Sequence, residues 1–157
     1  MDWDLAEQLR IAEEIERRKE AERIALRAEI NRCELQRDDA EARLQMLTEK
    51  VETQEEAHGK FRQLYGNYEE GRGQYAAMLE RLGLHREAVR LVAGHEAMIW
   101  ERVKGSLGEQ ASGNLESIDQ KMAAEIERNL EQMEILRQEI AEWNSRIDCL
   151  YGQLWRI

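Results

Sequence analysis

The sequence predicts an all-α fold: an elongated antiparallel helical hairpin, or coiled coil, with a short middle helix, as one domain over residues 1–157. The chain contains no proline, 36% of its residues are charged and 6% are aromatic, a composition typical of long helices. Apolar residues recur at alternating steps of four and three at both ends of the chain, the spacing of a coiled-coil seam. All ten glycines lie at or after position 59, so a glycine-free first arm precedes a glycine-dotted middle.

The first arm predicts one long helix over about residues 4–82. A 3.5-residue period held over that length indicates packing against another helix along a continuous seam. The predicted seam positions are Leu5, Leu9, Ala12, Glu16, Lys19, Arg23, Leu26, Ile30, Cys33, Arg37, Ala40, Leu44, Leu47, Val51, Gln54, His58, Phe61, Tyr65, Tyr68, Arg72, Tyr75, Leu79 and Leu82.

A short helix is predicted over about residues 85–104. Gly83 follows the last seam leucine, where a helix-ending glycine is expected. The apolar residues of the short helix cover more than one stripe, so we expect it to contact neighbours on more than one side.

A glycine-rich break is predicted over 105–113, because Gly105, Gly108 and Gly113 lie there. The C-terminal helix is then expected over about 114–157, with Ser112 or Asn114 as its cap.

The C-terminal helix carries its own seam. Met122 and Ile126 extend it upstream, with a one-step stutter expected near Leu115 and Ile118. The seam residues are Met133, Leu136, Ile140, Trp143, Ile147, Leu150, Leu154 and Ile157.

The chain is expected to fold back on itself, because one strand of a coiled coil cannot bury its own seam. A hairpin tip near Gly83 would place Trp100 beside Tyr65 and Tyr68. The alternative is a tip at 105–113 with an interruption of the first helix around 59–73.

The formal net charge of −10 argues against binding to nucleic acid, which requires clustered Lys and Arg, and against adhesion to anionic membranes. No apolar run approaches the length that spans a bilayer. The N-terminus, MDWDLAEQLR, lacks the features of a signal peptide. We therefore expect a cytoplasmic protein, exported, if at all, without a cleavable signal peptide.

Catalytic, cofactor-binding and metal-binding residues are not predicted, and the protein is not expected to be an enzyme. Cys33 and Cys149 are too few for a disulfide framework or a metal site and are interpreted as small buried hydrophobes. None of the three histidines has a partner at metal-ligand spacing. His58 occupies a seam position, where a polar side chain fixes helix register.

Six residues are candidates for binding a partner. The two-sided short helix contributes Val92, Ile99, Trp100 and Val103. The tryptophans near the chain ends, Trp3 and Trp155, would be brought together by the hairpin, either to cap its core or to anchor a helical partner.

The second half resembles one group of known proteins, from Trp100 through the glycines to NLESIDQKMAAEIERNLEQMEILRQEIAEWNSRI. It is similar to the WXG-type helical hairpin proteins of type VII secretion, and most to the partners encoded beside LXG-domain toxins. Those proteins place a Trp–x–Gly turn before a long terminal helix. Here Trp100 is followed by Glu101 and Arg102, so the tripeptide itself is absent.

The resemblance implies a partner protein that binds the helical leader of a secreted toxin and promotes its export by a type VII secretion system. A hetero-oligomer with the toxin leader or another small helical protein is then expected, with a homodimer as the alternative. A second family, the stalk proteins of type III and flagellar export, has similar length and hairpin form. A generic coiled-coil scaffold is the third hypothesis.

Overall fold

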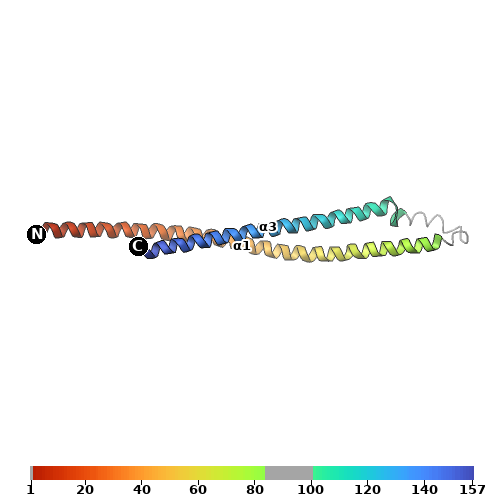
Figure 1. The fold of residues 1–157 in the computed structure, drawn as a ribbon, viewed down its shortest axis with the longest axis horizontal. Coiled ribbons are helices and arrows are strands. Elements are labelled where there is room, and N and C mark those ends of the chain that lie inside the picture. The colour runs from red at the N-terminus through yellow and green to blue at the C-terminus, as the bar shows by residue number, and fades with distance from the viewer. Residues whose placement is uncertain (1, 84–100) are drawn as a thin grey trace. The chain divides into compact units, whose positions relative to one another are not determined.

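The computed structural model describes residues 2–83 and 101–157, with the side chains of residues 4–78, 80, 81 and 101–157 (Figure 1). Two long helices account for nearly all of them: α1, Asp2–Gly83, and α3, Ser106–Arg156. No strand occurs in these ranges. The predicted all-α helical hairpin is confirmed.

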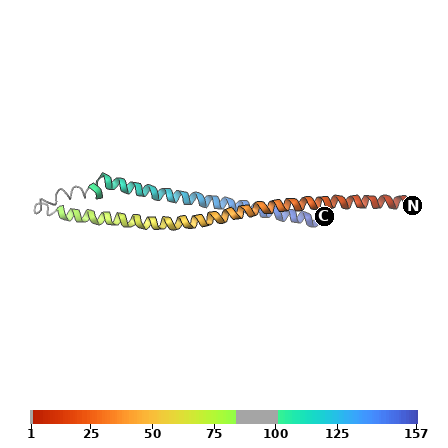
Figure 2. The same cartoon turned by 180° about the vertical axis from the view of Figure 1, so that it is seen from behind.

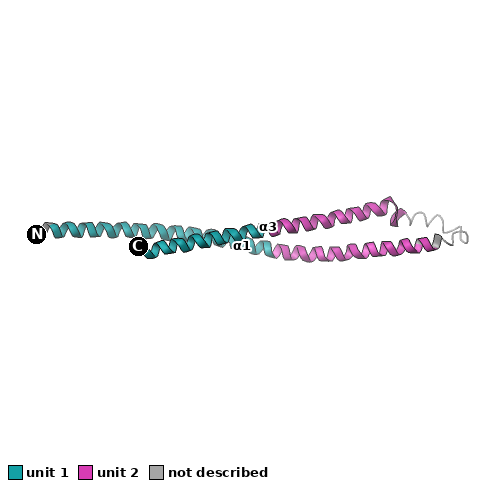
Figure 3. Ribbon diagram, in the orientation of Figure 1, with its two compact units in different colours: residues 1–48, 131–157 teal, residues 49–130 magenta. Residues whose placement is uncertain are grey.

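The chain divides into two units (Figure 3). Unit 1 contains residues 1–48 and 131–157, and unit 2 contains residues 49–130. Within each unit a stretch of α1 lies beside a stretch of α3 that runs in the opposite direction, as the views from both sides show (Figures 1 and 2).

The core of unit 1 follows the predicted seams. Ile30, Cys33, Ile147 and Leu150 form one buried cluster, and Leu26, Trp143 and Leu154 pack against it. Ala40, Met133 and Leu136 are also buried. Each of these residues lies on a predicted seam, so alternating steps of four and three place all of them on the inner face of the pair. Cys33 is buried as predicted, whereas Cys149 is exposed.

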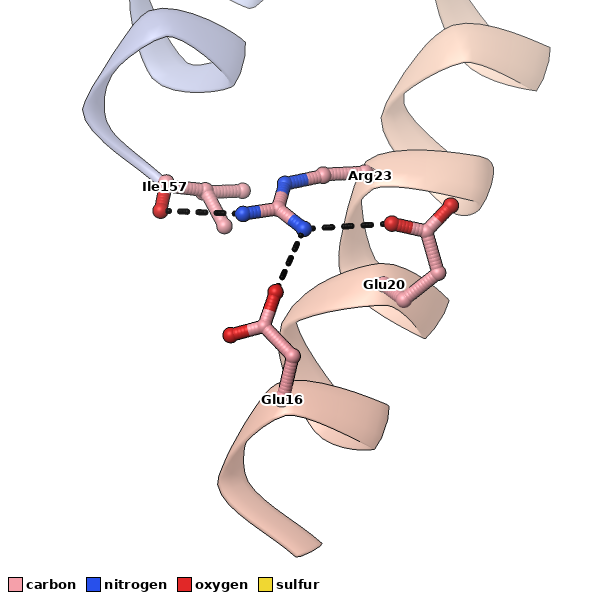
Figure 4. Close-up of polar contacts among 4 residues, drawn as sticks. All are labelled: Glu16, Glu20, Arg23 and Ile157. Carbon is pink, nitrogen blue, oxygen red and sulfur yellow. Dashed lines mark hydrogen bonds and ion pairs between the residues drawn. The ribbon is translucent and has the colours of Figure 1, made fainter. Parts of the chain in front are cut away.

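The contact between the two helices in unit 1 begins at Arg23. Nη2 of Arg23 donates a hydrogen bond to the main-chain oxygen of Ile157 at 3.4 Å, while Nη1 contacts Glu16 and Glu20 (Figure 4). The segment of α1 before Arg23 extends past the end of α3. Leu5 and Leu9, predicted to be seam residues, are 62% and 59% exposed there.

Unit 2 continues the seam of α1 with a change of phase after Tyr65. Val51 and Ala76 are buried, and the rings of Phe61 and Tyr65 stack with centroids 6.4 Å apart. Beyond Tyr65, Glu69 and Ala76 turn inward, whereas the predicted Tyr68 and Tyr75 are exposed. The steps from Phe61 to Tyr65 and from Tyr65 to Glu69 are both four residues, and these two successive steps produce the shift. The change keeps the helix closer to its natural 3.6 residues per turn.

The α3 seam runs without the stutter predicted near Ile118. Ile118 is 44% exposed, and Asp119 occupies the inward position instead. Regular steps of three and four join Leu115, Asp119, Met122 and Ile126. The stutter was expected because an isoleucine fits an apolar seam better than an aspartate, but Asp119 has a polar partner on α1.

The C-terminal helix begins at Ser106, eight residues before the predicted start. Gly108 and Gly113 lie inside it, so the break is confined to Lys104 and Gly105. Ser112 and Asn114 are helical residues and do not cap the helix. A long break was expected because glycine disfavours helix, but tertiary contacts outweigh that intrinsic preference here.

The hairpin reverses between Glu80 and Lys104, whose side chains form an ion pair at 2.7 Å. The alternative tip at 105–113 is wrong, because α3 already runs antiparallel to α1 there, and α1 is uninterrupted over 59–73. The predicted tip next to Gly83 and most of the predicted helix 85–104 lie outside the described residues. Neither described helix has an apolar stretch sufficient to cross a bilayer.

Candidate protein-interaction surfaces

The predicted partner-binding residues are placed only in part. Val92, Ile99 and Trp100, with the predicted neighbourhood of Trp100, lie outside the described residues, as does the side chain of Trp3. Val103 is half-buried rather than free to face a partner. Trp155 is 85% exposed, so it remains available as an aromatic anchor.

Trp3 and Trp155 are not brought together. Trp155 lies two residues before Ile157, which reaches Arg23, whereas Trp3 lies twenty residues earlier in α1. At 1.5 Å per residue that separation is roughly 30 Å along the helix. The interpretation of the two tryptophans as a joint cap of the core is therefore wrong. It assumed a hairpin whose two arms have equal length.

The corner before α3 explains two of the three predicted break glycines. A Cβ on Gly108 would lie 2.6 Å from the carbonyl oxygen of Val103, and a Cβ on Gly105 would collide with Glu101. Nε of Arg72, from α1, also donates to the Val103 carbonyl. Gly113 has nothing within 4 Å of its Cβ position, so only Gly105 and Gly108 are required by close packing.

Glu101 caps the start of α3. Its Oε1 accepts hydrogen bonds from the backbone N–H of Ser106 at 3.1 Å and from the Ser106 hydroxyl at 2.7 Å. The Ser106 hydroxyl, with the backbone N–H groups of Ser106 and Leu107, holds the pKa of the Glu101 carboxyl below its ordinary value. A carboxylate at this position also complements the positive end of the helix dipole.

Polar pairs interrupt the seam of unit 2. Nε2 of His58 lies 2.7 Å from Oδ1 of Asp119, and the two side chains are 14% and 23% exposed. One turn away, Gln54 accepts a hydrogen bond from Asn129 at 2.8 Å and donates one to Glu125 at 3.2 Å. His58 thus lies at the seam, as predicted, and these pairs can form only in one helix register.

The two sides of the unit 2 seam carry different residues at the flanking positions. In an antiparallel helix pair, one side of the seam is flanked by the residues that come just before every second seam position, as Ile118 comes before Asp119. The other side is flanked by the residues that come just after the remaining seam positions. On the first side four apolar residues occur in succession: Ala57, Leu64, Ala111 and Ile118. We call these four residues the flank patch. Leu64 is 68% exposed and Ile118 44% exposed.

The opposite side of unit 2 forms a groove of about 410 Å³ lined by both charged and apolar side chains. Its lining is mostly charged or small, and Arg62 Nε lies 3.7 Å from Asp119 Oδ1 beside it. The lining residues are Glu55, His58, Gly59, Arg62, Ala123, Ile126, Glu127 and Leu130.

Unit 1 has a groove of about 620 Å³ on the side where Arg146 pairs with Glu29. Trp143 lines this groove, and its Nε1 is buried with no hydrogen-bond partner. The other lining residues are Arg32, Cys33, Gln36 and Glu142. The groove is shallow and follows the boundary between the helices, which is the form of a helix-packing surface rather than of a substrate pocket.

Among the described residues, no group of three or more His, Cys, Asp or Glu side chains is arranged to hold a metal ion. Comparisons with known protein families, with curated proteins and with solved structures found no match to this chain.

Proposed function

We propose that this chain is a non-catalytic helical partner protein that binds another helix along the flank patch of unit 2. The observation that carries the proposal is the difference between the two sides of the seam. Leu64 and Ile118 are exposed on one side, at nearly the same height along the pair, while charged side chains such as Glu55 and Arg62 line the other. An exposed apolar strip bordered by polar residues is the usual form of a docking surface.

The geometry of the flank patch suits a third helix. A heptad separates Ala57 from Leu64, and another separates Ala111 from Ile118. Lys50 lies one heptad before Ala57, and Glu125, which accepts a hydrogen bond from Gln54, lies beside Ala57, so the apolar strip ends at charged residues on this side. A partner helix lying between α1 and α3 would cover about two of its own turns there, with i, i+3 and i+7 apolar residues inserted into the strip.

The class of partner that we propose is the helical leader of a secreted LXG-type toxin, which the chain would guide to a type VII secretion system. Two features support this class. The second half resembles the WXG-type partners, and α3 starts directly after Gly105, five residues beyond Trp100. The break is thus short, closer to a tight turn before a long terminal helix than the sequence alone predicted.

Co-expression with the toxin encoded beside this chain tests the proposal. We expect the two proteins to elute together, and the charge substitutions Leu64→Glu and Ile118→Glu to separate them while the circular dichroism spectrum stays helical. Leu130→Glu is the matched control, because Leu130 is 43% exposed but lies on the opposite side of the same unit. Separate elution of the wild-type proteins would contradict the toxin assignment. Equal effects of Leu64→Glu and Leu130→Glu would contradict the flank patch.

A further inference from the structure

The part of α1 that belongs to unit 2 contains four glycines that its packing does not require. A Cβ placed on Gly59, Gly66, Gly71 or Gly73 would meet nothing within 4 Å, and no glycine among the described residues has a positive φ. Neither close packing nor backbone geometry therefore accounts for glycine at these positions. Each of them weakens the helix relative to alanine, because glycine loses more backbone entropy on folding than any other residue.

The same stretch of α1 buries little apolar surface. Val51 and Ala76 are buried, but every residue of α1 between them, including Phe61 and Tyr65, is half-buried or exposed. In unit 1, by contrast, residues 30–40 contain no glycine and contribute three buried side chains to the seam. A helical stretch with few buried apolar contacts and several glycines has a low free energy of local opening.

Polar contacts join this stretch of α1 to the opposite side of the hairpin. The Ser112 hydroxyl donates a hydrogen bond to Glu69, and Nε of Arg72 donates one to the main-chain oxygen of Val103. Hydrogen bonds of this kind add only modest net stability, because water takes their place when the helix opens. They fix where α1 lies when it is closed, but they do not make up for the missing apolar core.

We propose that residues 59–73 of α1 form a segment that opens locally, as a conformational switch built into unit 2. Leu64, one of the four residues of the flank patch, lies within this segment, so each opening takes the patch apart and each closing restores it. The opening equilibrium therefore sets the fraction of molecules that present a complete patch, and any helix that binds the complete patch shifts the equilibrium toward the closed segment. The switch is a property of the chain by itself and does not depend on the identity of that helix.

Hydrogen–deuterium exchange of the full-length chain under native conditions, read by mass spectrometry, tests the switch. After correction for intrinsic exchange rates, we expect the protection of amides in 59–73 to be lower than that in 30–44 by about a hundredfold or more. In the triple variant Gly66→Ala, Gly71→Ala and Gly73→Ala, exchange of the segment should slow by about fivefold for each substitution, or about a hundredfold in total. Equal protection of the two ranges, or an unchanged rate in the triple variant, would overturn the proposal.

Gly113→Ala is the matched control, because Gly113 also meets open space but lies in α3 of the same unit. Since the proposed opening is confined to α1, this variant should leave the exchange of residues 59–73 unchanged. Equal slowing by Gly113→Ala and Gly66→Ala would mean that unit 2 opens as a whole, and would overturn the local switch. The exchange is measured on the chain alone, so its outcome is separate from that of co-expression with a toxin.

Discussion

Nε2 of His58 lies 2.7 Å from Oδ1 of Asp119 in the seam between α1 and α3 of unit 2. The two residues are 61 positions apart in the sequence, so the pair forms only when α1 and α3 adopt one relative register. The contact thus serves the specificity of the fold more than its stability, as polar residues in coiled-coil seams commonly do.

The first prediction concerns this pair. Asp119→Ala leaves the half-buried ring of His58 without its partner, and we expect the free energy of unfolding to fall by about 1–3 kcal/mol. The double variant with leucine at both positions should recover most of that loss, because apolar side chains satisfy the seam without a polar contact. Urea denaturation of His58→Leu, Asp119→Leu and the double variant measures the coupling. Additive losses in the double variant would mean that the pair does not interact.

The second prediction concerns the glycines at the start of α3. Gly108→Ala places a methyl group 2.6 Å from the Val103 carbonyl oxygen, so we expect a loss of about 1–3 kcal/mol as the corner is forced apart. Gly113→Ala meets open space in the same helix and should stabilise by about 0.5–1 kcal/mol. Thermal unfolding of both variants gives the comparison. A shift in the same direction for both would refute the packing of the corner.

The third prediction concerns pH and the Glu101 cap. Folding lowers the pKa of the Glu101 carboxyl, so its contribution to the stability of the helix start is present above the ordinary glutamate pKa and is lost as the pH falls through the lowered value. Nuclear magnetic resonance titration of the Glu101 carboxyl should give a midpoint below the ordinary pKa of glutamate.

The variant Glu101→Gln should remove this pH dependence. We expect the amide protons of Ser106 and Leu107 to exchange faster in the variant near neutral pH, and the difference from wild type to shrink as the pH is lowered past the Glu101 midpoint. Unchanged exchange at neutral pH would show that Glu101 does not cap α3.

The fourth prediction contrasts two isoleucines of unit 1. Ile147→Ala opens a cavity in the cluster with Ile30 and Cys33, at a side chain that is 4% exposed, and should cost about 2–4 kcal/mol. Ile135→Ala changes a side chain that is 53% exposed and should alter stability by less than about 0.5 kcal/mol. Comparable losses in urea denaturation would place the core elsewhere.

Much of the fold could be predicted from the sequence, because the 3.5-residue period is a local signal repeated many times. The seam from Arg23 to Tyr65 and the seam from Met133 to Ile157 both face inward as predicted. The errors lie where two neighbouring positions compete. Tyr68 and Glu69 are adjacent, as are Ile118 and Asp119, and hydrophobicity alone favours the first of each pair.

The inward residues of those pairs are selected by contacts that no local pattern reveals. Glu69 accepts a hydrogen bond from Ser112, and Asp119 contacts His58. The start of α3 was missed for a related reason. Gly108 reads as a helix breaker in the sequence, but its lack of a side chain is what allows the helix to begin against the Val103 carbonyl. The unequal reach of the two helices was also hidden, because the hairpin register fixes it and the apolar pattern does not.

The most direct test of the account is whether α1 and α3 pair within one molecule in the register described here. In an Ile147→Cys variant with Cys149→Ser, the introduced thiol should lie in the same buried cluster as Cys33. We predict that mild oxidation of a dilute sample forms a disulfide within one chain, seen as a monomer of altered mobility under denaturing, non-reducing conditions. A disulfide formed only between two chains would mean that the helices pair with another copy, and would contradict the helical hairpin.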